Sequence, residues 1–246
     1  MNFLIILLIN IQRVTIGSAQ HVLPIVLAVL FCVVLFRFAK RRPQKQKEVL
    51  FEALGVFVSL TIIVFHSYKI SQGDYSVSVD LPLYLCSFLA LIIPVFTYYR
   101  KYWMYEILLF WIIAGTSQGV ITPDIAVGYP SFDFFRYWIA HLGLLTIIFY
   151  ATFVLRMRPK LKSVFKSLVA IQGYLISSFG INALLGGNYS YLNRKPASAS
   201  VLDYLPEWPY YIIVVEVFLI PLFLLIYLPF YVTRKKTTSQ ITDSYL

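Results

Sequence analysis

The sequence predicts an all-α polytopic membrane protein, and three observations support this fold class. Hydrophobic residues make up 59% of the chain and charged residues only 13%, about half the charged fraction of an ordinary soluble domain. The apolar residues are gathered in long blocks, close to the ~20 residues that a helix needs to cross a bilayer. These blocks do not alternate apolar and polar residues as the strands of a membrane barrel do. Because only helices and closed barrels satisfy the backbone in lipid, we expect a bundle of transmembrane helices.

Seven blocks reach or approach spanning length. We expect them as helices at 21–39, 49–68, 81–98, 103–122, 134–155, 165–185 and 209–232. The first and third are the weakest, since each is short or carries an early proline. Basic clusters follow the first, third, fifth and seventh blocks, and two glycines follow the sixth. We therefore expect one seven-helix transmembrane domain over residues 21–232.

The two ends of the chain are expected to lie outside this domain. Residues 1–20 begin with an apolar run that is too short to span and lacks the basic start of a signal peptide, so we expect a short interfacial segment. Residues 233–246 are expected to form a tail.

The basic residues predict the orientation of the bundle. Sixteen of the 21 lysines and arginines fall in alternate connections and in the tail. The other five are Arg13, Lys69, Arg136, Arg194 and Lys195. The positive-inside rule then places the N-terminus outside and the C-terminus in the cytoplasm of a multi-pass cell-membrane protein. The formal charge of +10 thus reports topology and contact with anionic lipid headgroups, and we expect no nucleic-acid partner.

Several classes of site are absent from the sequence. Cys32 and Cys86 lie in different apolar blocks and have no zinc-like spacing, so no disulfide framework is expected. No phosphate-binding glycine loop, HExxH or GxSxG motif occurs. We expect no metal and no cofactor, and the oligomeric state stays open.

Polar residues gather in the outer halves of the predicted helices. This outer set comprises His21, His66, Cys86, Gln118, His141, Asn182 and Glu216. A single such residue is typical of an interhelical hydrogen bond, but seven at one depth favour a polar pocket open to the outer leaflet. The loop "GGNYSYLNRKP" adds Asn188, Tyr189, Arg194 and Lys195, which we expect to form a lid that binds an anion.

The motifs "HSYKISQGDYSVSVDLPLYLCS", "RYWIAHLGLL" and "GGNYSYLNRKPASASVLDYL" resemble those of YwaF-like bacterial integral membrane proteins. The sequence is also distantly similar to eukaryotic transmembrane protein 164, a cysteine-centred phospholipid acyltransferase, and this resemblance implies acyl transfer. YwaF-like proteins usually have histidine where this chain has Tyr84. Aligned through Pro82, the nucleophilic cysteine of the eukaryotic protein falls at Leu83, three residues before Cys86 and on the same face if the segment is helical.

The resemblance suggests a catalytic set with a membrane phospholipid as substrate. Cys86 is the candidate nucleophile and His141 the candidate base, with His66 orienting the pair or sharing the base role. We expect Pro82 to start a helix and to leave Cys86 one turn inside it.

The substrate-binding candidates are Tyr84, Asn182, Asn188, Tyr189, Arg194, Lys195 and Glu216. Tyr84 or Asn182 would donate a hydrogen bond to the developing oxyanion.

Two alternatives to acyl transfer remain open. A transporter would use Glu216, His66 and His141 as a relay. A sensor or scaffold would bind lipid without chemistry. In either case Cys86 is a small apolar residue that fills space between helices.

Overall fold

The computed structural model describes residues 13–196 and 200–243, with side chains as far as Thr233. Most of the expected N-terminal segment and the last residues of the expected tail therefore lie outside the described residues. The described chain is helical and contains no strand, so the all-α prediction is confirmed for this part.

The helices follow the order of the predicted blocks. They are α2 (Ala19–Lys40), α3 (Gln44–Ser71), α4 (Leu85–Tyr99), α5 (Tyr102–Trp111), η1 (Ile112–Thr116), α6 (Ser117–Ile121), α7 (Phe132–Phe153), α8 (Leu161–Leu185) and α9 (Tyr210–Asp243), with short 3₁₀ turns η2 (Tyr189–Tyr191) and η3 (Val201–Tyr204). Among the described residues, six helical segments are long and apolar enough to cross a membrane: 19–40, 44–71, 102–121, 132–153, 161–185 and 210–233. The helix α4 is apolar but has only 15 residues.

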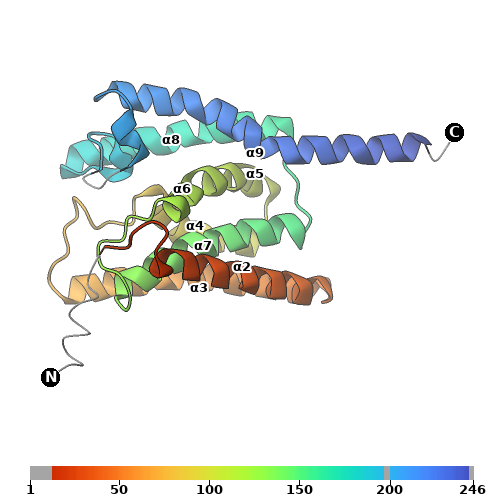
Figure 1. Cartoon of the computed structure of the whole chain (residues 1–246), viewed down its shortest axis with the longest axis horizontal. Coiled ribbons are helices and arrows are strands. Elements are labelled where there is room, and N and C mark those ends of the chain that lie inside the picture. Colours follow the sequence, from red (N-terminus) through yellow and green to blue (C-terminus); the bar gives the residue numbers. More distant parts are fainter. Residues whose placement is uncertain (1–12, 197–199, 244–246) are drawn as a thin grey trace.

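The segment formed by α5, η1 and α6 counts as one helix here. Successive helices then run in opposite directions, so the connections separate into two groups (Figure 1). The short connections 41–43, 100–101 and 154–160 lie at one end of the bundle, towards the C-terminus of α9. The longer connections 72–84 and 122–131 and the described parts of the last one, 186–196 and 200–209, lie at the other end, which we call the loop end. The loop end is the one predicted to face outside.

An aromatic core joins the central helices. The Phe51 ring of α3 stacks on Tyr150 of α7, with ring centres 5.5 Å apart, and meets Phe96 of α4 edge-on at 5.4 Å. All three side chains are fully buried. The helix α8 packs against α5, and α9 packs against α8. By contrast, α2 and α9 expose many large apolar side chains, as expected of helices that face lipid.

The third predicted helix begins later than expected, which corrects two predictions. Residues 81–84 form turns, and Tyr84 precedes the helix with an extended backbone (ψ 141°). Distant side chains take the backbone groups of this segment: the Tyr189 hydroxyl accepts from the Leu81 amide (3.0 Å), and the Tyr174 hydroxyl donates to the Leu83 carbonyl (2.8 Å). Pro82 therefore does not start the helix, and Cys86 is the second residue of α4 instead of lying one turn inside it.

The expectation that Leu83 and Cys86 share one helix face is wrong for the same reason. Leu83 precedes the helix.

The fourth predicted helix is interrupted by a π-helical turn. The turn η1 separates α5 from α6, and its last residue, Thr116, is fully buried. A π turn inserts one extra residue into a helix and rotates the residues after it, and such turns are frequent at functional sites. Here it decides which residues of the fourth segment face α4 and α7.

Candidate functional site

Cys86 lies at the loop end of α4, where η1 meets it. Its side chain is half-buried, and its thiol donates to the Thr116 hydroxyl with a Sγ–Oγ1 distance of 3.8 Å. The cysteine thus contacts a hydroxyl group at the end of the π-helical turn.

His141 is held in one orientation on α7. Its Nδ1–H donates to the Tyr137 carbonyl at 2.8 Å, and its ring stacks on that of Tyr137 at 4.0 Å. The edge of the ring formed by Cδ2 and Nε2 meets Gly119 of α6, where an added Cβ would lie 2.6 Å from Nε2. Since Nδ1 carries the proton, Nε2 of the neutral ring has a free lone pair and is the atom that could accept a proton.

Cys86 and His141 lie against neighbouring positions of one helical face. Cys86 meets Thr116 and His141 meets Gly119, three residues further along the same segment. Residues three apart are neighbours on a helix surface, with a rise of about 5 Å between them. Among the described residues, however, the Cys86 thiol makes no hydrogen bond to a histidine.

Tyr137 connects these parts to the neighbouring loop. Its hydroxyl donates to the Gly119 carbonyl at 2.9 Å and accepts from the Asp124 amide at 3.2 Å. The side chain is buried. Tyr137 therefore fixes α6 and the following loop against α7 beside His141.

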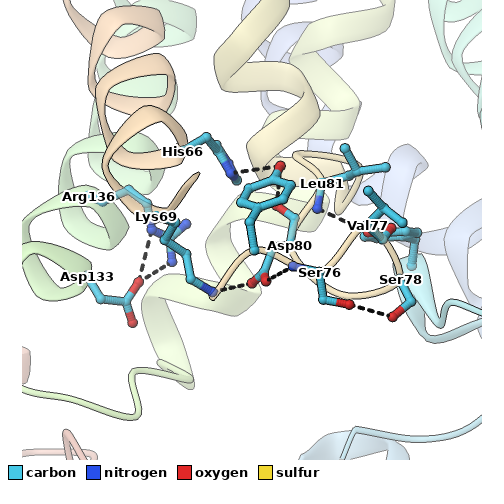
Figure 2. Close-up of polar contacts among 11 residues, drawn as sticks. His66, Lys69, Ser76, Val77, Ser78, Asp80, Leu81, Asp133 and Arg136 are labelled. Carbon is cyan, nitrogen blue, oxygen red and sulfur yellow. Dashed lines mark hydrogen bonds and ion pairs between the residues drawn. The ribbon is translucent and has the colours of Figure 1, made fainter. Parts of the chain in front are cut away.

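His66 has a different location from the one expected of a partner to Cys86. Figure 2 shows it at the loop end of α3, facing the connection 72–84. Its Nδ1 lies 3.4 Å from the Tyr75 hydroxyl, which donates to the Asp80 carbonyl at 3.2 Å. In the described structure its Nε2 is buried without a hydrogen bond. His66 thus contacts the loop that precedes Cys86 instead of the cysteine itself.

Asp80 fastens this loop to α3. Its carboxylate forms an ion pair with Lys69 and accepts from the Ser76 amide at 2.9 Å, as Figure 2 shows. Partial burial by itself raises the pKa of Asp80, but the hydrogen bonds and charge of Lys69 and the Ser76 amide outweigh it and hold the pKa below its ordinary value. The loop is therefore anchored by a carboxylate that remains charged at neutral pH.

Asn182 and Tyr189 form a scaffold at the loop end of α8. The Asn182 amide accepts from the Tyr189 backbone N–H at 2.7 Å and donates to the Tyr189 carbonyl at 2.9 Å. The fully buried Tyr189 side chain donates to the Val77 carbonyl at 2.7 Å and accepts from Leu81. These two predicted binding residues join the segment after α8 to the loop before α4.

The other loop-end candidates line a cavity of about 470 Å³. Its walls are Ser78, Val79, Tyr84, Gly186, Asn188, Tyr191, Arg194, Lys195 and Pro196. Four predicted substrate-binding residues, Tyr84, Asn188, Arg194 and Lys195, are therefore brought together. The wall also contains Tyr191, which the sequence analysis did not identify.

The remaining members of the outer set do not join this region. Glu216 of α9 accepts from the Gln172 amide of α8 at 2.5 Å, with no contact to a histidine in the described structure. His21 accepts from the Gly17 amide at 2.9 Å and donates to the Val120 carbonyl at 2.8 Å, so both its ring nitrogens are occupied. The three histidines, Cys86, Asn182 and Glu216 thus form several separate contacts instead of one network.

No three His, Cys, Asp or Glu side chains of the described chain gather closely enough to hold a metal ion.

The arrangement can be compared with known proteins at this point. The sequence model of the TMEM164 family matches residues 16–227, which include every element from α2 to most of α9. The chain belongs to the TMEM164 family. No curated protein and no solved structure matches it. Family membership and the six spanning helices together make this TMEM164 family member a multi-pass integral membrane protein. Its resemblance to the YwaF-like proteins stays a prediction.

Proposed function

We propose that this TMEM164 family protein transfers an acyl chain from a membrane phospholipid, with Cys86 as nucleophile and His141 as base. The single observation that carries the proposal is the orientation of His141. Its Nδ1–H bond to Tyr137 leaves Nε2 unprotonated, and the ring packs on Gly119, three residues after Thr116, the partner of the Cys86 thiol. Membership of the TMEM164 family supports it, because the resemblance to eukaryotic transmembrane protein 164 implies cysteine-centred acyl transfer.

The proposed reaction has two steps, formation of a thioester on Cys86 and transfer of its acyl chain to an acceptor. In the first step the Cys86 thiol gives its proton to Nε2 of His141, and the sulfur attacks the ester carbonyl. The ester C–O bond then breaks, and the lysolipid alkoxide takes the proton from the imidazolium. The hydroxyl of an acceptor then attacks the thioester and gives its proton to His141, and the proton returns to the departing Cys86 sulfur. For the first step the thiol must leave its hydrogen bond to Thr116 and turn towards His141.

The proposed topology places this reaction in the outer leaflet. We propose that α4 is a seventh span, shorter than the others, and that the loop end faces outside. The distribution of basic residues supports this orientation. A helix of 15 residues is about 22 Å long, so the non-helical residues 81–84 would extend it to the interface.

The thioester intermediate provides the test. The purified chain in nanodiscs containing phospholipid with a labelled acyl chain is expected to gain that chain on Cys86, in a bond that hydroxylamine cleaves. Cys86→Ala should abolish the label, and His141→Gln should reduce it by about 10²–10⁴-fold, the usual contribution of a general base. Cys32→Ala is a matched control, because Cys32 also lies in a helix and also contacts a threonine hydroxyl, Thr146, at 3.2 Å. Equal labelling of the wild type and Cys86→Ala would show that the cysteine is not the nucleophile.

Lipid binding without chemistry is the second candidate. The observation that favours it is the hydrogen bond of the Cys86 thiol to Thr116, a contact that a structural cysteine also makes. On this alternative, Cys86→Ala would bind phospholipid as the wild type does, and neither protein would form a thioester.

A further inference from the structure

The cavity at the loop end is built from two segments that are far apart in the sequence. One wall comes from residues 78–84, immediately before α4, and the other from residues 186–196, after α8. Tyr189 joins the two walls through its bonds to Val77 and Leu81. The cavity therefore has a fixed frame, since its shape depends on buried hydrogen bonds.

The side chains of the second wall give the cavity a positive charge. Arg194 is exposed, and within the described chain its guanidinium has no ion pair or hydrogen bond. Lys195 is only 16% exposed and contacts the Leu205 carbonyl at 2.8 Å and Glu207 at 3.1 Å. Glu207 is 90% exposed, so water screens its attraction for Lys195.

The backbone at Arg194 is held in place beside the cavity. The Asn188 side chain accepts from the Asn193 and Arg194 amides at 3.0 and 3.1 Å and donates to the Arg194 carbonyl at 2.9 Å. Asn188 is thus occupied in shaping the loop, whereas the guanidinium remains available. A guanidinium presents several N–H donors in a plane that matches the oxygens of a phosphate.

Two phenols supply neutral donors. Tyr84 and Tyr191 both line the cavity, with ring centres 5.5 Å apart. Neither hydroxyl has a hydrogen-bond partner among the described residues. Burial raises the pKa of Tyr191 to about 12, so this hydroxyl keeps its proton at neutral pH. The cavity therefore offers O–H and N–H donors of the kind that bind an anion.

We propose that this cavity binds the phosphate of a glycerophospholipid, with Arg194, Tyr84 and Tyr191 as the donors, and so directs the lipid ester towards Cys86. The second part rests on the proposed function. Tyr84 stands two residues before Cys86, and the Tyr191 ring lies 5.5 Å from that of Tyr84. In a glycerophospholipid only the glycerol unit separates the phosphate from the ester, so one lipid molecule would occupy both places.

A binding experiment separates this proposal from the acyl-transfer proposal. The full chain carrying Cys86→Ala, which cannot form the thioester, is titrated in detergent micelles with phosphatidylglycerol and with diacylglycerol of the same acyl chains. We expect phosphatidylglycerol to bind about tenfold or more tightly, because a hydrogen bond to a charged group contributes on this scale. Arg194→Gln should remove this preference, and Tyr191→Phe should reduce it.

Lys162→Gln on α8 is the matched control for loss of one positive charge. Lys162 is exposed and lies at the opposite end of α8, so its replacement should leave the preference unchanged. If Arg194→Gln and Lys162→Gln weaken binding equally, the attraction is general electrostatics and the proposal is overturned.

Inorganic phosphate distinguishes the two sources of the ligand. We expect it to compete with phosphatidylglycerol only at concentrations at least about tenfold higher, because it lacks the acyl chains that bury apolar surface. Equal affinity would overturn the assignment to a lipid. If the Arg194-dependent preference is found and no thioester forms on the wild type, only the acyl-transfer proposal fails.

Discussion

The contact between Gly119 and His141 gives a sharp test of the candidate site. A Cβ added at Gly119 would lie 2.6 Å from both Cδ2 and Nε2 of His141 and 3.0 Å from the Tyr137 hydroxyl. The imidazole cannot easily retreat, since it stacks on the Tyr137 ring and its Nδ1 is bonded to the Tyr137 carbonyl. In Gly119→Ala the imidazole or the whole of α6 must therefore move.

The size of the effect follows from two opposing contributions. Overpacking of a tightly packed site costs about 1–3 kcal/mol. Alanine in place of a helical glycine returns up to about 1 kcal/mol. We expect Gly119→Ala to lower the free energy of unfolding by about 1 kcal/mol. Gly173→Ala on α8 is the matched control, because nothing lies within 4 Å of its added Cβ, and it should be neutral or stabilising.

The assay combines unfolding in detergent with thioester formation. Gly119→Ala should unfold more readily than Gly173→Ala and should also label Cys86 more slowly, because the displaced atoms include Nε2 of His141. A merely structural contact would change the unfolding alone. Equal stability and equal labelling in the two alanine variants would refute the packing of His141 against α6.

Three further predictions concern the bundle. Gly143→Ala should destabilise the protein by about 1–3 kcal/mol, since its Cβ would lie 2.4 Å from Val58 Cγ2. The double variant Gly143→Ala/Val58→Ala should recover part of this loss in the same unfolding assay. Asp80→Asn should lower the free energy of unfolding at pH 7. Because the folded protein lowers the pKa of Asp80, the wild type should keep this stabilisation above the ordinary pKa of 3.8 and lose it as the pH falls through the lower folded pKa. The variant should show no such loss of stability over that pH range. In a chain without Cys32 and Cys86, Gln44→Cys should resist an impermeant thiol reagent added outside, and labelling from outside would reverse the proposed orientation.

Hydropathy predicts the centres of the helices well and their ends poorly. The second and sixth blocks were expected to begin at 49 and 165, but α3 begins at Gln44 and α8 at Leu161. Polar first turns of this kind lie beyond the hydrocarbon and are continued by local hydrogen bonds, such as that between the Lys160 amide and the Ser163 hydroxyl (2.9 Å). Hydropathy detects the apolar layer, whereas the helix ends where its backbone bonds end.

The late start of α4 depends on residues that no local pattern identifies. Tyr189 lies 108 residues from Leu81, and Tyr174 lies 91 residues from Leu83. Their hydroxyls occupy backbone groups that a helix starting at Pro82 would have used. A tertiary contact thus overrides a favourable local signal, and it moves the candidate nucleophile to the first turn of its helix.

Depth along a helix is only one of the two coordinates that decide whether polar residues meet. The sequence placed seven polar residues at a similar depth, but rotation about each helix axis sends Glu216 to Gln172 and His66 to Tyr75. A π turn adds a further rotation that hydropathy cannot detect, and here it turns Thr116 towards Cys86.

One feature of the sequence nevertheless indicates which face of the fourth helical segment packs against its neighbours. Gly115 and Gly119 stand four residues apart in the fourth block, and small residues at this spacing mark a helix face that approaches its neighbours closely. In the structure an added Cβ at Gly115 would meet Leu85 beside Cys86, and one at Gly119 would meet His141. The glycine pair therefore identifies the face of the fourth segment that packs against the first turn of α4 and against His141.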